Sequence, residues 1–229
     1  MNTLADMRTQ VRSRIDEPSQ AFWENSELDT WIYEATREIA RRGEILQDVQ
    51  VTQCVIGIQQ YDAPTDMIRF SRAEYVQAGG NRIPLEYRPL HEMDNVWYQS
   101  RTLTQGTPTW FSWWGFPSGE QRAQIYLYPS PSDTGQFALF YYRMPHKPVE
   151  DDDLVEIPAG WEDLVPLYAE IVARRKDNDR RWQEAAEIFE AKLGQLLAVT
   201  RQPSDQMTHV VSADTGWPGW AGDGLSDWY

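Results

Sequence analysis

The chain has 229 residues, enough for one substantial hydrophobic core or two small ones. Its 35 acidic residues outnumber 21 basic ones, and the net charge of -14 repels phosphate and argues against sequence-reading DNA binding. No stretch approaches the roughly 20 apolar residues of a membrane-spanning helix, and no secretory signal opens the chain, so we expect a cytoplasmically folded protein with no membrane partner. Cys54 is the only cysteine, which excludes an intrachain disulfide, and the eleven tryptophans suggest assembly, because tryptophan is enriched in interfaces.

Two helices are predicted at the N-terminus. Thr3 and Asp6 have the spacing of a capping box, and Pro18 ends the helix that follows. Ser26 and Asp29 repeat the capping signature, and Gly43 closes the second helix. The second helix has an apolar stripe of Leu28, Trp31, Ile32, Ala35 and Ile39.

From Asp48 to about Lys147 the apolar period changes to two, which predicts a block of β-strands. Residues 79–81, Gly-Gly-Asn, predict a hairpin turn. Residues 129–135 join two strong strand patterns, 124–128 and 136–144, which we expect to be antiparallel neighbours. Pro84, Pro89 and residues 99–106 predict loops.

Helical spacing returns after the acidic run 151–153. With Asp163 as the N-cap, Pro166 falls in the first turn, where its missing N–H is harmless. Asp179 is expected to cap a last helix that pairs with the previous one as an antiparallel hairpin. The sequence therefore predicts an α+β fold: N-terminal bundle helices in 1–47, an inserted antiparallel β domain in 48–150, a C-terminal helical hairpin in 151–201, and an extended arm in 202–229.

The arm is rich in glycine and lacks periodicity, so it should not order alone. At about 3.3 Å per residue it can reach about 90 Å, far enough to lie on a neighbouring protein. The aromatic residues expected to bind a partner there are Trp217, Trp220, Trp228 and Tyr229.

The sequence shows no catalytic, cofactor or metal site. His91-Glu92 fails the H-E-x-x-H zinc pattern because Asn95 replaces the second histidine, and residues 151–153 lack the glycine and distal glutamate of a calcium loop. We interpret that acidic run as a solvated charge run. Residues 115–119 do not form a nucleophile elbow, and no phosphate-binding glycine motif occurs.

The densest aromatic cluster spans residues 110–116. We interpret Trp110, Trp113 and Trp114 as filling a sheet core and a subunit contact. The alternative is a sugar-binding platform, but such a platform needs convergent polar groups that the sequence does not identify.

Several motifs together resemble phage head-to-tail adaptor proteins. The second helix reads FWENSELDTWIYEATREIARR over residues 22–42, and five short motifs follow in the order typical of that family. These are YDAP at 61–64, TPT at 107–109, IYLYPSP at 125–131, FALFYYRMP at 137–145 and DDDLVEIP at 151–158. The resemblance covers residues 3–200; Pro166 and the tryptophan-rich end depart from the family pattern.

The resemblance implies a non-enzymatic virion protein of the phage neck. It implies a twelve-fold ring below the portal protein, a tail or nozzle protein beyond it, a C-terminal arm on the portal, and genomic DNA passing without sequence-specific binding. Two alternatives remain at this point. One is a carbohydrate-binding or tail-fibre-attachment module that uses residues 110–116, and the other is a virion-associated cell-wall hydrolase.

Overall fold

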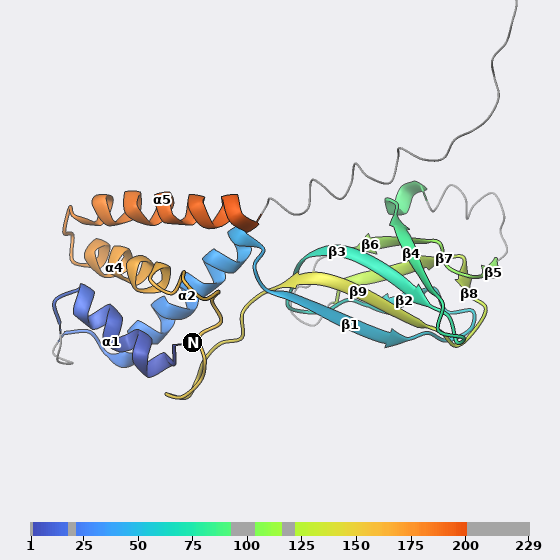
Figure 1. The fold of residues 1–229 in the computed structure, drawn as a ribbon, viewed down its shortest axis with the longest axis horizontal. Coiled ribbons are helices and arrows are strands. Elements are labelled where there is room, and N and C mark those ends of the chain that lie inside the picture. The colour runs from blue at the N-terminus through green and yellow to red at the C-terminus, as the bar shows by residue number, and fades with distance from the viewer. Residues whose placement is uncertain (1, 18–21, 93–103, 116–121, 201–229) are drawn as a thin grey trace, which may run out of the picture.

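The computed structural model describes residues 2–17, 22–92, 104–115 and 122–200. Helices from both ends of the chain pack side by side, and a curled sheet lies beyond them along the long axis of the molecule (Figure 1). The helices are α1 Leu4–Arg14, α2 Asn25–Gly43, α4 Leu164–Lys176 and α5 Trp182–Thr200. The expected α+β fold with helices at both ends is confirmed, whereas the expected arm, 202–229, lies outside the described residues.

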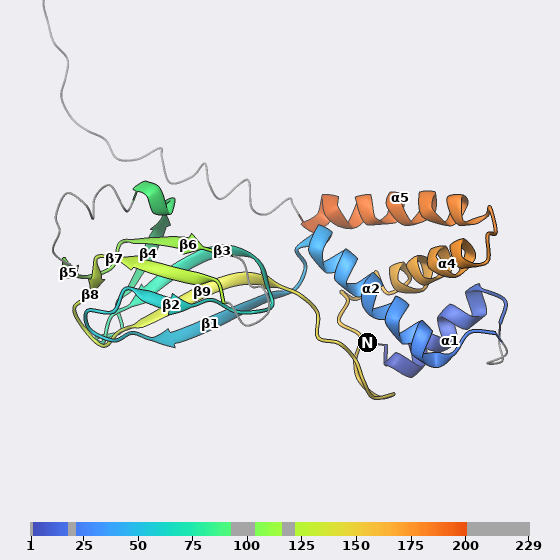
Figure 2. The same cartoon turned by 180° about the vertical axis from the view of Figure 1, so that it is seen from behind.

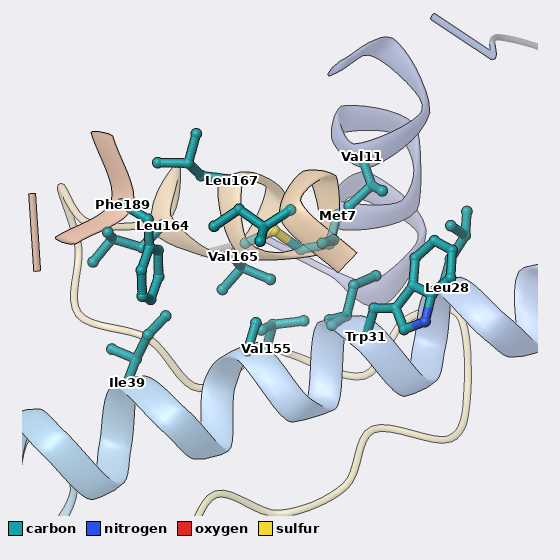
Figure 3. Close-up of a cluster of buried hydrophobic side chains, with 14 of the residues drawn as sticks. Met7, Val11, Leu28, Trp31, Ile39, Val155, Leu164, Val165, Leu167 and Phe189 are labelled. Atoms are coloured by element: carbon teal, nitrogen blue, oxygen red, sulfur yellow. The ribbon is translucent and has the colours of Figure 1, made fainter. Parts of the chain in front are cut away.

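The helical body has its own apolar core. Side chains from all four helices converge there, and Val155 joins them from the segment that leads into α4 (Figure 3). Leu28, Leu164 and Leu193 have no exposed surface. Each such leucine contributes roughly 1.5–3 kcal/mol by leaving water, so the two ends of the chain stabilise one another.

The N-terminus of α1 is capped as the sequence predicts. The Thr3 hydroxyl accepts a hydrogen bond from the Asp6 N–H at 3.2 Å, and the Asp6 carboxylate accepts one from the Thr3 N–H at 3.1 Å. The acidic run does more than remain solvated, because the Asp153 carbonyl accepts from Leu4 N–H at 2.9 Å. That carbonyl satisfies one of the free donors of the first helical turn.

The predicted cap at Ser26 is wrong. Helix α2 starts at Asn25 with Glu24 as N-cap and no side-chain cap bond. The Arg12 guanidinium donates to the Asn25 side-chain oxygen at 2.9 Å at this helix end. The predicted cap at Asp179 has its hydrogen bond, because the Asp179 carboxylate accepts the Arg181 N–H at 3.0 Å in the turn that leads into α5. The same carboxylate pairs with Arg174 and Arg181.

The other two helix ends agree with the sequence. Asp163 is the N-cap of α4, without a side-chain cap bond, so Pro166 lies in the first turn and removes no intrahelical hydrogen bond. Helix α2 ends at Gly43, although the left-handed residue there is Glu44, with φ 48°. Helices α4 and α5 pack as the predicted hairpin.

Seven strands within the described residues form the curled sheet in the order β1-β9-β3-β4-β6-β7-β2. They are β1 Gln47–Gln53, β2 Gln60–Asp62, β3 Met67–Val76, β4 Arg82–Tyr87, β6 Trp110–Trp114, β7 Gln124–Tyr128 and β9 Gln136–Arg143. Two short strands, β5 Gln105–Gly106 and β8 Ser130–Pro131, pair separately. The sheet is mixed rather than antiparallel throughout, because β4 and β6 run parallel.

Two strand predictions need correction. Strands β7 and β9 do not pair: β7 lies between β6 and β2, and β9 lies between β1 and β3, because residues 129–135 carry the chain from one half of the sheet to the other through β8. Pro84 is inside β4 rather than in a loop. It fits there because the β6 ladder begins only at Glu86, so no partner strand requires an N–H from residue 84. The predicted turn at 79–81 does join β3 to β4.

The sheet curls around a second apolar core. Tyr75, Ile125 and Phe137 are buried at its centre. The curl brings the two edge strands close together, where the Gln50 side-chain amide of β1 donates to the Asp62 carbonyl of β2 at 3.5 Å. The outer faces of the strands therefore form the outside of the β body.

Candidate functional site

The predicted tryptophan cluster is divided between two faces of β6. Phe111 is buried and Trp113 packs against the inner core, whereas Trp110 and Trp114 point outward on the other side of the strand. Trp114 is 60% exposed. A sugar platform built from Trp113 and Trp114 together is therefore excluded by the alternation of the strand.

Trp110 is held in a stack on the outer face. Its ring lies parallel to that of Tyr128 on β7, with centroids 5.4 Å apart, and the Arg88 guanidinium covers it at 3.7 Å. Arg88 also pairs with Glu86 at 3.2 Å. On the outer face of β6, the Trp110 ring is therefore covered, and the Trp114 ring is the one exposed to solvent.

A cleft of about 560 Å³ opens where the helical body meets the sheet. It is lined by the ends of α2 and α5, the start of β1, and Tyr142 of β9. Thr200, the last residue of α5, lies in its wall. Residues 202–229, including Trp217, Trp220, Trp228 and Tyr229, lie outside the described residues.

Ion pairs fix the junction around the cleft. Arg143 at the end of β9 donates to both carboxylate oxygens of Glu156 at 2.6 and 2.9 Å, and Arg69 of β3 pairs with Glu44 at 2.6 Å. The Arg143 hydrogen bond, reinforced by the His146 N–H, lowers the pKa of Glu156 to about 2. These pairs connect the end of β9 to the segment that leads into α4, and β3 to the end of α2.

Sequence reasoning missed an exposed apolar surface on β1. Of the twelve large hydrophobic side chains that are exposed in the described part of the chain, five come from residues 49–58. They are Val49, Val51, Val55, Ile56 and Ile58. Alternation predicts the strand but does not say which of its faces turns outward, so the only signal available was the near absence of charge in this stretch.

Within the described ranges, no group of three or more His, Cys, Asp or Glu residues could hold a metal ion. In the same part of the chain, no helix has the length and apolarity needed to cross a membrane. The exposed face of β6 carries aromatic groups, and the stretch 49–58 carries aliphatic groups. Such surfaces are suited to contact with other polypeptides.

The model of one protein family, described as SU10 adaptor protein, matches residues 2–213. The chain belongs to the SU10 adaptor protein family. The match includes the helical body and the whole β body, so this SU10 adaptor carries the family domain over nearly its full length. The resemblance to phage head-to-tail adaptors is thereby confirmed, and the chain is a phage structural adaptor. No curated protein matches this SU10 adaptor.

Proposed function

We propose that this adaptor is one protomer of a twelve-membered ring beneath the portal, which links the capsid to a tail or nozzle protein. The observation that carries the proposal is the family match over residues 2–213 of this chain. The matched region has helices at both ends and a β body between them. The net charge of -14 suits a lumen through which DNA slides without adhering.

The C-terminal segment is the proposed portal contact. Thr200, which lines the cleft, precedes it in the sequence, and its aromatic residues are concentrated in 217–229. A tethered second contact raises the effective concentration of the first, so the segment adds affinity through avidity.

The test is co-sedimentation of the purified chain with portal-containing heads. The full chain should sediment with heads and saturate at a fixed number of copies per head. Deletion of residues 202–229, or Trp217→Ala with Trp220→Ala, should reduce binding at least tenfold, whereas Ile188→Ala on the exposed side of α5 should leave it unchanged. Equal binding by the deletion variant would refute the arm contact, and no binding by the full chain would refute the adaptor role itself.

A further inference from the structure

Strands β6, β7 and β2 share an outer face that carries both aromatic and polar side chains. The three strands lie side by side in the β body (Figure 2). Their inward side chains belong to the sheet core, so the alternate residues point outward. Register aligns the outward residues in rows across the strands. Two of these rows are Trp114, Gln124, Asp62 and Ser112, Tyr126, Gln60.

Three polar side chains of this face form a hydrogen-bonded amide–carboxylate chain. The Gln60 amide donates to the Gln124 side-chain oxygen at 3.1 Å, and the Gln124 amide donates to the Asp62 carboxylate at 2.9 Å. Arg122 pairs with the other oxygen of that carboxylate at 3.4 Å. A carboxylate has about four acceptor positions, so Asp62 retains acceptor positions for a ligand. The amide–carboxylate chain holds these groups in place before binding, which lowers the entropy lost on binding.

Aromatic rings lie beside the amide–carboxylate chain. Trp114 is 60% exposed at one end of its row, and Tyr126 is half-buried in the next row. An open hollow of about 540 Å³ lies on this face, lined by Tyr126, by the amide–carboxylate chain and by residues 57–59. From Trp114 to Asp62 the row spans two strand spacings, about 10 Å. The face therefore combines an apolar ring with a polar hollow within the length of a short oligosaccharide.

One polar group of the face has no partner. The Ser112 hydroxyl is buried and forms no hydrogen bond within the described residues. Register places Ser112 between Trp110 and Trp114 along β6 and opposite Tyr126 on β7. Buried polar groups are nearly always paired, so this face retains an unused hydrogen-bonding group among its aromatic rings.

The chemistry of the face distinguishes between classes of ligand. Nucleic acid also stacks on aromatic rings, but it carries phosphate, which a chain of net charge -14 repels. The centre of a protein–protein interface is depleted of charged residues, whereas the Asp62–Arg122 pair lies directly beside the amides here. A neutral pyranose has an apolar C–H face that stacks on an indole ring. Its neighbouring hydroxyls match amide and carboxylate groups.

We infer that the outer face of β6, β7 and β2 binds a neutral oligosaccharide. The exposed Trp114 ring takes the apolar face of one sugar, and the amide–carboxylate chain binds the hydroxyls of the next. The Trp110 ring is not part of this site, because the rings and guanidinium stacked on it already cover it. The inference adds a binding activity to the adaptor and does not depend on the proposed ring.

The test is an array of neutral oligosaccharides probed with the purified full chain. Oligomers of N-acetylglucosamine represent cell-wall glycans, and oligomers of glucose, galactose and mannose represent surface polysaccharides. Isothermal titration with the oligomer that binds best then compares variants. Trp114→Ala and Asp62→Ala should each weaken binding roughly tenfold, because the first removes the stacking ring and the second removes an ionised acceptor.

Two further variants are the controls. Trp114→Phe keeps an aromatic ring and should retain most of the affinity, whereas Phe22→Ala removes a 69% exposed ring before α2 and should bind as the wild type does. Melting temperatures show whether the variants fold, and exposed positions should change them little.

The expected result is a loss of sugar binding by Trp114→Ala with binding to portal-containing heads unchanged. Sugar binding by Trp114→Ala equal to that of the wild type would overturn the inference, as would a wild-type chain that binds no oligomer on the array at millimolar concentration. Loss of head binding by Trp114→Ala, with no sugar bound by the wild type, would overturn it too and would assign the face to a protein contact.

Discussion

At the scale of single residues, Glu156 is the carboxylate whose environment changes most on folding. Its pKa falls from an ordinary 4.5 to about 2, chiefly because Arg143 donates to it. The folded state therefore favours the charged form, and the stabilisation is complete above about pH 4.5 and is lost as the pH falls toward 2. The junction between the β body and the helices should loosen over that interval.

Glu156→Gln should lower the free energy of unfolding at pH 7 by roughly 2 kcal/mol, after solvent screening of the pair. At pH 2 the variant and the wild type should differ little, since the carboxyl group is then about half protonated in the folded state and almost fully protonated in the unfolded state. Urea unfolding at the two pH values measures this. Glu150→Gln, whose exposed carboxylate forms no ion pair in the described residues, is the control. An equal deficit at both pH values would contradict the ion-pair explanation.

Gly135 is a second residue whose identity is fixed by its surroundings. A methyl group there would lie 2.5 Å from the Val76 carbonyl oxygen and 2.6 Å from the Tyr75 hydroxyl. Gly135→Ala should therefore destabilise the protein by about 1–3 kcal/mol through overpacking. Thermal unfolding compares it with Gly79→Ala, which meets no atom within 4 Å. A melting temperature like that of the control would show that the backbone yields at this point.

At the scale of elements, helix α1 provides a test of capping. Thr3→Ala removes a real cap and should cost about 1 kcal/mol, whereas Ser26→Ala, at the cap position that the sequence suggests for α2, should change stability by less than about 0.5 kcal/mol. Denaturant titration of both variants measures the difference. Equal losses would mean that Ser26 caps α2 in solution.

Strand β6 provides the corresponding test for a sheet. Trp113→Ala should cost about 3 kcal/mol because the indole packs on the inner core, and Trp114→Ala should cost less than about 1 kcal/mol because its side chain faces water. Unfolding monitored by circular dichroism separates them. If Trp114→Ala were the less stable variant, Trp114 rather than Trp113 would face the core.

The same strand shows which features of elements are predictable. Periodicity located the four bundle helices, the block of strands and, within it, β7 and β9, and turn residues located the β3–β4 connection. Strand neighbours were not predictable, because β7 and β9 are consecutive in sequence yet lie in different halves of the sheet. The outward face of β1 was not predictable either, since alternation is the same whichever side is buried.

At the scale of the whole molecule, the order of helices, sheet and helices was predictable because each block has its own period. The site was predictable only in part. Trp114 is exposed as a contact residue should be, whereas Trp113 belongs to the core. Residues 217–229 stay a prediction, because their proposed role depends on a partner chain.

The β body leaves and rejoins the helical body at one point. Gln47 is the cross-strand partner of Tyr142, and Arg143 N–H donates to the Leu46 carbonyl at 2.9 Å. A short turn joining residue 46 to residue 143 would therefore close the bundle without moving a helix. The chain thus enters and leaves the sheet through one pair of adjoining strands, so the helices and the sheet are separate lengths of backbone joined at a single place.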